Sequence, residues 1–117
     1  MFYLLAVLVF AGPVIAGLLA PISERVVISG HTDNVPISNA RFPSNWELSS
    51  SRALNFMKFI LAQDGRLQPA RFSATGCSEY RPVASNDTEE GRTQNRRVEV
   101  LIARAYQPDK SKMQMIP

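Results

Sequence analysis

Apolar and polar residues follow one another in blocks along the chain, and the blocks predict alternating strands and helices. Residues 25–30 are largely β-branched and end in a glycine, which is typical of a strand. Residues 72–75, followed by Gly76, predict a second, shorter strand. A final strand is indicated where Val98, Val100 and Ile102 alternate with the residues between them. A short helix is expected over residues 88–95, although Gly91 weakens it.

A longer helix is predicted between the first two of these strands. Ser44 is a suitable N-cap, and Glu47 stands three residues later, as in a capping box. Apolar residues then recur at the helical period, at Ala53, Met57, Ile60 and Leu61. Gly65 is expected to end the helix as a left-handed C-cap. The polar loop before this helix covers residues 31–43.

The first 23 residues carry no charged side chain, and two interpretations of them stay open. Residues 1–22 are long enough to act as a membrane anchor. Alternatively, Gly12-Pro13 breaks this apolar run, so that residues 2–10 form an opening strand and residues 13–20 a helix, and Pro21 closes the run. In that helix, Val14, Leu18 and Leu19 would share one face. The sequence thus divides into an apolar segment at 1–23, a folded domain at 24–104 and a polar tail at 105–117.

The order of elements predicts a two-layer α/β sandwich, because alternating strands and helices must bury their apolar faces against each other. The composition agrees: of 117 residues, 45% are hydrophobic and 20% charged, which excludes a disordered chain. The net charge of +3 suits an anionic partner such as a cell-wall polymer, lipid headgroups or nucleic acid, without choosing among them. Cys77 is the sole cysteine, so no internal disulfide can form.

Candidate chemistry gathers around the carboxyl end of the first predicted strand, where Asp33 follows directly. On the next helix, Asn45, Ser49 and Arg52 are spaced to form one stripe. A carboxylate facing a guanidinium can bind a zwitterion, since the Asp accepts an ammonium while the Arg binds a carboxylate in bidentate fashion. The alternative is an internal Asp33–Arg52 salt bridge that fixes the loop.

Four ordered motifs extend this picture: GHTD at residues 30–33, N..LS..RA at 45–53, EYRP..SN at 79–86 and GR..NRRVE at 91–99. Together they resemble the OmpA-like peptidoglycan-binding domain over about residues 14–103, and above all the form found in flagellar stator proteins of the MotB type. The resemblance implies a βαβαβαβ, α+β sandwich with a mixed sheet. Its first strand and helix would be short or degraded here.

The resemblance also implies roles for individual residues. Asp33 would bind the ammonium of diaminopimelate in the peptide stem, and Arg52 its carboxylate. Flanking or further contacts would come from Thr32, Asn45, Arg92, Ser49, Arg96 and Arg97, although the last two also suit packing between helix and strand. The sequence departs from the family at Cys77-Ser78, which replace an aromatic residue and a glycine. The missing glycine is expected to strain a tight turn.

The expected function is non-catalytic binding of peptidoglycan in the periplasm, where the domain would anchor a membrane or flagellar motor complex to the wall. A stator membrane partner, a homodimer and attachment to the inner membrane through residues 1–22 belong to this expectation. The alternative is a structural remnant or dimerisation module without wall affinity. No nucleophile elbow, metal-ligand set or nucleic-acid module is present in the sequence, so no catalysis, metal, cofactor or nucleic acid is expected. His31 is expected to orient the loop through a hydrogen bond.

Overall fold

A computed structural model describes residues 2–7 and 12–103 of the chain. Its elements, in chain order, are β1 (Phe2–Val7), α1 (Gly12–Leu19), β2 (Arg25–His31), α2 (Asn45–Gln63), the 3₁₀ turn η2 (Pro69–Arg71), β3 (Phe72–Gly76), α3 (Glu89–Asn95) and β4 (Arg97–Ala103). This order confirms the predicted βαβαβαβ arrangement and its α+β class. The predicted polar tail at 105–117 lies outside the described residues.

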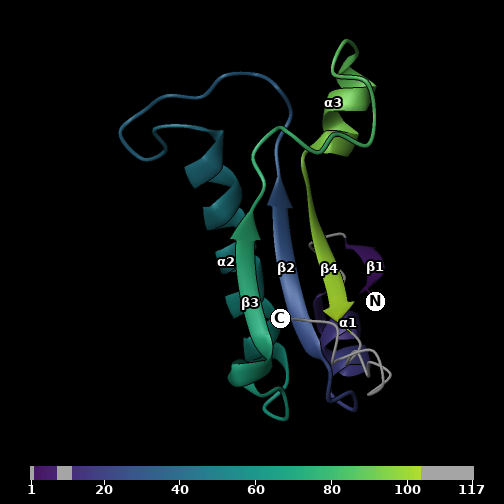
Figure 1. The fold of residues 1–117 in the computed structure, drawn as a ribbon. Helices are drawn as coiled ribbons and strands as arrows, with labels where there is room; N and C mark the ends of the chain where they lie inside the picture. Colours follow the sequence, from purple (N-terminus) through teal and green to yellow (C-terminus); the bar gives the residue numbers. More distant parts are fainter. Residues whose placement is uncertain (1, 8–11, 104–117) are drawn as a thin grey trace, which may run out of the picture.

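The four strands form one mixed sheet in the order β1-β4-β2-β3. β2 is parallel to β3 and antiparallel to β4, which in turn pairs antiparallel with β1. The carboxyl ends of β2 and β3 therefore meet at one end of the sheet, where the loop after β2 and the helix α3 also lie (Figure 1). Polar side chains that follow these two strands are brought together at that end.

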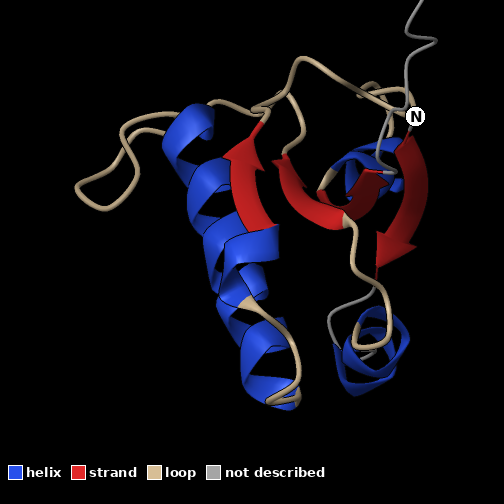
Figure 2. Ribbon diagram, turned by 60° about the horizontal axis from the view of Figure 1, so that its bottom comes forward, coloured by secondary structure: helices blue, strands red, loops and turns tan. Residues whose placement is uncertain are grey.

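α1 and α2 pack against the same face of the sheet, and the hydrophobic core lies between these helices and the sheet (Figures 1 and 2). Val26 and Ile28 from β2 and Val100 from β4 are fully buried there. The long helix covers them with Ala53, Phe56 and Ile60, whose spacing follows the helical period. Met57 and Leu61, predicted for the same stripe, pack at its margin and are partly buried.

The start of α2 forms as its sequence predicts. The Ser44 hydroxyl accepts from the Trp46 backbone N–H at 3.2 Å and donates to the Glu47 carboxylate at 2.7 Å. The predicted C-cap is wrong, because α2 ends at Gln63 with Asp64 as its cap, and no described glycine has a positive φ. The Asp64 carboxylate instead accepts the Arg66 backbone N–H at 2.9 Å, which turns the chain without a left-handed residue.

The structure follows the folded interpretation for β1 and α1, with a six-residue strand and an eight-residue helix. The predicted inner face of α1 is wrong in part. Leu19 is buried as expected, but Ile15 and Ala16 accompany it, while Val14 and Leu18 are exposed. The described ranges contain no helix of sufficient length and apolar character to span a membrane.

Two glycines let α2 lie unusually close to the sheet. A Cβ atom at Gly30 would collide with the backbone carbonyl of Ser49, and one at Gly76 would collide with Ser50. Because both glycines stand at the carboxyl ends of their strands, the close approach occurs beside the loop that carries Asp33. It thereby fixes the first half of α2 relative to that loop.

Candidate functional site

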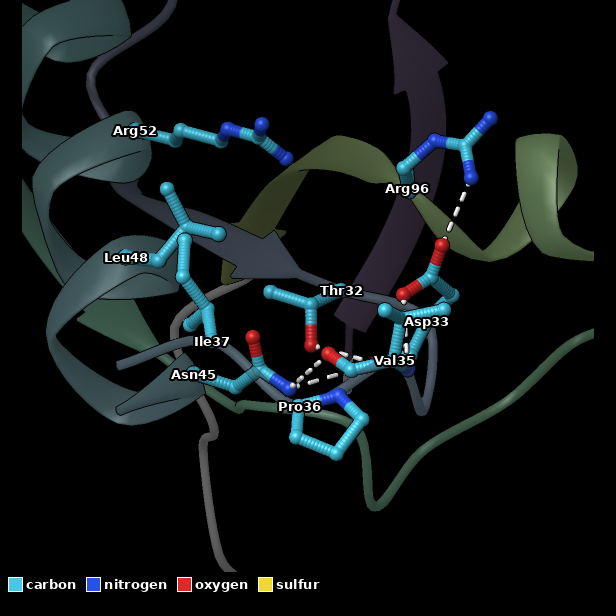
Figure 3. Close-up of a pocket in the computed structure, with 9 residues that line it drawn as sticks. All are labelled: Thr32, Asp33, Val35, Pro36, Ile37, Asn45, Leu48, Arg52 and Arg96. Atoms are coloured by element: carbon cyan, nitrogen blue, oxygen red, sulfur yellow. Dashed lines mark hydrogen bonds and ion pairs between the residues drawn. The ribbon is translucent and has the colours of Figure 1, made fainter. Parts of the chain in front are cut away.

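A pocket of about 290 Å³ opens at the carboxyl end of β2, between the loop that follows it, the first half of α2 and the end of α3 (Figure 3). Nine residues line it: Thr32, Asp33, Val35, Pro36, Ile37, Asn45, Leu48, Arg52 and Arg96. The pocket therefore brings together four of the predicted site residues, Thr32, Asp33, Asn45 and Arg52. It also includes Arg96, for which both a ligand contact and a packing role were expected. Their charged and polar atoms share the pocket with a mostly aliphatic wall.

Asp33 is paired with Arg96, and the sequence did not predict this pairing. Its Oδ2 atom accepts a hydrogen bond from Arg96 Nη1 at 2.6 Å, and its Oδ1 atom accepts the Val35 backbone N–H at 3.0 Å. The alternative of an internal Asp33–Arg52 salt bridge is wrong, because Arg96 takes that position. Arg96 is itself held by Glu89 at 2.8 Å.

The contacts of Arg96 also affect its proton affinity. Its hydrogen bonds to Glu89 and then to Asp33 raise the pKa of the guanidinium above its ordinary value. The same Arg96 contact, followed by that of Arg92, lowers the pKa of Glu89. Both pKa shifts favour the charged forms, so the ion pair between Arg96 and Glu89 persists throughout the neutral range.

Arg52 extends from α2 over the pocket towards the side on which Arg96 lies (Figure 3). It is exposed and has no ion pair or hydrogen bond with any residue in the described ranges. A guanidinium without an internal partner presents all its donors to an incoming anion. Arg52 is therefore the pocket cation that is available to a ligand carboxylate.

Asn45 and Thr32 shape the loop from within. The Asn45 side-chain amide donates to the Val35 carbonyl at 3.1 Å and to the Asp33 carbonyl at 3.5 Å. The Thr32 hydroxyl donates to the Asp33 carbonyl at 2.8 Å. Both side chains are buried and line the pocket, so in this structure they support the loop that presents the Asp33 carboxylate.

Three other predicted residues lie away from the pocket lining. Arg92 pairs with Glu89 at 3.1 Å and donates to a loop carbonyl, and Arg97 pairs with Glu99 at 2.7 Å. Ser49 is fully buried, where its hydroxyl donates to the Trp46 carbonyl and accepts the Ser78 N–H at 3.0 Å. The two ion pairs lie within α3 and within β4, and Ser49 joins α2 to the turn after β3.

Asn95 is a residue that sequence analysis missed. It is fully buried, and its side chain makes four hydrogen bonds to the loop before α3, with Val83, Ala84 and Asn86 as partners. It stands next to Arg96, so it fixes the point from which Arg96 reaches Asp33. An asparagine directly before an arginine pair was visible in the sequence, but its three partner residues are 9 to 12 positions away.

The turn after β3 shows the backbone strain that was expected where Ser78 replaces the glycine of the family. Ser78 adopts φ 57°, the sole positive φ of a non-glycine residue in the described ranges. The residue is buried, its N–H donates to Ser49, and its carbonyl accepts the Thr32 N–H at 2.9 Å. The strained turn therefore links α2 to the pocket loop, and Cys77 beside it is buried.

Replacing Ser78 by glycine is expected to raise the free energy of unfolding by about 0.5–1 kcal/mol. Relief of the left-handed conformation gains about 1–2 kcal/mol, from which the greater backbone entropy of unfolded glycine subtracts about 0.5–1 kcal/mol. Urea denaturation followed by circular dichroism measures the change. Ser51→Gly, inside α2, should destabilise instead, and equal effects of both substitutions would contradict the role of φ.

His31 is buried beside a charged network on the face of the sheet opposite the helices. Its Nε2 atom lies 3.4 Å from a Glu99 carboxylate oxygen, but neither ring nitrogen makes a hydrogen bond with a described residue. The expected loop-orienting hydrogen bond is thus wrong. Burial, which is the largest cause, and then the positive charges of Arg97 and Arg81 lower the pKa of His31. The Glu99 carboxylate acts in the opposite direction but does not outweigh them.

The lowered pKa of His31 predicts a loss of stability in acid. The unfolded chain, with a histidine pKa near 6.5, binds the proton more tightly than the folded chain. This contribution is therefore complete above about pH 6.5 and declines as the pH falls from there through the folded pKa. Urea midpoints at pH 7.5 and 5.5 should differ more for the parent than for His31→Gln, and equal differences would refute the prediction.

Taken together, the pocket presents one carboxylate and two guanidiniums, one of which is already paired. It can therefore accept a ligand that carries an ammonium group beside one or two carboxylates. Across residues 2–7 and 12–103, no three His, Cys, Asp or Glu side chains gather into a possible metal site.

Comparisons with known proteins point in one direction. The model of the OmpA family matches residues 14–96. Motility protein B of Bacillus subtilis is 60% identical over 79 residues, which cover 68% of this chain and 30% of that protein. Peptidoglycan-binding protein ArfA of Mycobacterium tuberculosis is 35% identical over 78 residues, or 67% of this chain and 22% of that protein. The chain spans less than two fifths of the length of the curated relatives it matches.

Solved structures share the fold. The periplasmic domain of Helicobacter pylori MotB superposes with a TM-score of 0.78 at 28% identity, covering 92% of this chain and 68% of that one. The cell wall anchor of the T6SS from Pseudomonas aeruginosa gives a TM-score of 0.69 at 42% identity, covering 78% and 62%. The fold is thus shared with these proteins.

Proposed function

The chain belongs to the OmpA family, and from this premise we propose that it binds peptidoglycan without catalysing a reaction. The observation that carries the proposal is the arrangement of Asp33, Arg52 and Arg96 around one pocket. Similarity to a peptidoglycan-binding protein and to a cell wall anchor supports the same conclusion. The domain would act in the periplasm, as the corresponding part of MotB does.

We propose diaminopimelate of the peptide stem as the group that enters the pocket. Its side chain ends in an ammonium and a carboxylate on one carbon atom. The ammonium would approach the Asp33 carboxylate, and the carboxylate would bridge to Arg52 in bidentate fashion. Arg96 holds the Asp33 carboxylate in place through their hydrogen bond, and it can also share the ligand carboxylate. Thr32 and Asn45 would keep the loop in the binding conformation.

The wider role follows from the similarity to Motility protein B. We propose that the domain holds a membrane complex to the cell wall, in a flagellar motor or a related assembly. A stator membrane partner and pairing of two copies are parts of the same proposal. Attachment of residues 1–22 to the inner membrane stays a prediction.

Arg52→Ala is expected to weaken binding to diaminopimelate-type sacculi at least about tenfold, because a charge-assisted hydrogen bond contributes about 1.5–3 kcal/mol. Co-sedimentation of the purified chain with sacculi, over a range of concentrations, measures the affinity. Circular dichroism establishes that each variant is folded. Lys58→Ala removes an exposed cation farther along the same helix and serves as the matched control.

Sacculi of the lysine type add a second test, since their stems lack the terminal carboxylate. They should bind the parent about as weakly as diaminopimelate-type sacculi bind Arg52→Ala. If the folded parent stays in the supernatant, the chain has the fold without wall affinity. If Arg52→Ala sediments like the parent, the assignment of the pocket is wrong.

A further inference from the structure

We propose that Trp46 and Tyr80 form a stacking platform for the sugar rings of the glycan strand, beside the pocket for its peptide stem. The inference rests on the proposed function and extends it from the stem to the saccharide. It assigns a second contact region on the same ligand. The platform consists of these two aromatic side chains alone.

The two rings lie 5.5 Å apart between centroids, at an interplanar angle of 33°. Both are open to solvent, with 49% of Trp46 and 66% of Tyr80 exposed. Large aromatic side chains gain most from burial, so an exposed pair marks a surface that a ligand can cover. Neither ring packs into the hydrophobic core of the described residues.

Each ring is tied closely to the pocket. Trp46 lies in the first turn of α2, between the pocket residues Asn45 and Leu48. Tyr80 follows the strained turn at Ser78, whose carbonyl accepts the N–H of the pocket residue Thr32. The platform and the pocket therefore share one rigid frame.

The spacing also fits the ligand. Trp46 lies six positions before Arg52, which corresponds to about 9 Å along the axis of α2. A stem of three residues, from its sugar to diaminopimelate, spans about 10 Å when extended. Along the axis of α2 the stem is therefore long enough to join Arg52 to Trp46, which lies about 120° away around the helix.

The chemistry of a saccharide suits such a platform. The flat faces of a pyranose ring carry weakly positive C–H groups, and these are attracted to the negative face of an aromatic ring. The hydroxyl and acetamido groups at the ring edges keep their contact with water. The pair needs no charge for this contact, which distinguishes it from the ionic pocket.

The experiment compares two soluble probes by calorimetry: the stem tripeptide alone, and the same tripeptide joined to its disaccharide. The parent should bind the disaccharide-tripeptide about three- to tenfold more tightly than the tripeptide. Trp46→Ala and Tyr80→Ala should each reduce this ratio while leaving the affinity for the tripeptide unchanged. Phe59→Ala, which removes an exposed ring from the far half of α2, should leave both affinities unchanged.

An independent readout comes from the fluorescence of Trp46, the sole tryptophan of the chain. Its emission should change with the disaccharide-tripeptide and much less with the tripeptide. The inference is overturned if the parent gains nothing from the sugars, or if Trp46→Ala weakens both probes alike in a folded protein. If the parent binds neither probe, the proposed function fails and the platform with it.

Discussion

Replacing Gly30 by alanine is expected to lower the free energy of unfolding by about 3 kcal/mol. The new Cβ would collide with the carbonyl oxygen of Ser49 and lie 2.9 Å from its carbonyl carbon, and both are backbone atoms in the middle of a buried helix face. A flexible side chain could move aside, but here α2 itself must shift away from β2. Overpacking of this kind costs about 1–3 kcal/mol, and more where backbone has to move.

The control is the same substitution at Gly17, in α1, where a Cβ meets nothing within 4 Å. Gly17→Ala should be neutral or stabilise by about 0.5–1 kcal/mol, since alanine is the better helix former. Urea denaturation of both variants gives the comparison. A Gly30→Ala protein as stable as the parent would show that α2 does not depend on this close approach.

Asn95→Ala is expected to destabilise the fold by about 3 kcal/mol as well. The substitution leaves the backbone N–H groups of Val83 and Ala84 and the Ala84 carbonyl without their partner. These groups are partly buried. A polar group that loses its hydrogen bond out of contact with water costs about 1–3 kcal/mol, although water entering the loop recovers part of this. Chemical denaturation measures the loss, with the exposed Asn55→Ala as a control expected within about 0.5 kcal/mol of the parent.

The same substitution should also weaken binding at the proposed site. Asn95 fixes the loop and the end of α3 from which Arg96 holds Asp33 at 2.6 Å. Binding of the stem tripeptide to Asn95→Ala should therefore weaken at temperatures where the protein is still folded. Unchanged affinity in a folded but less stable variant would show that Arg96 is positioned without help from Asn95.

The strands and the long helix were predictable because their signals are local. The β-branched residues before Gly30 favour a strand by themselves, and the Ser44–Glu47 cap needs only residues within one helical turn. The end of α2 was mispredicted because Gly65 looked like a left-handed cap, whereas Asp64 formed a side-chain turn one residue earlier. The buried face of α1 was also mispredicted, since apolar residues lie on more than one side of that helix and only its packing partners decide which side is buried.

The pocket was partly predictable. Asp33 and the stripe of Asn45 and Arg52 follow from a strand end and a helical repeat. The pairing of Asp33 with Arg96 was not predictable from spacing, because it joins residues 63 positions apart across the sheet. Local periodicity contains no information on such a contact, and the family motif named Arg96 without its partner.

The position of β1 has a mechanical consequence. Phe2 pairs with Ala103 at the end of β4, and Ala103 also pairs with Arg25 at the start of β2, while the pocket stands at the other end of β2. A force applied between the pocket and the first residue of β1 would run along the strands. It would load the six residue pairs between β1 and β4 in shear, so that their hydrogen bonds share the tension and break together. Under such a load the sheet holds up to a threshold force and then gives way at once, whereas a hairpin peeled from one end opens one bond at a time.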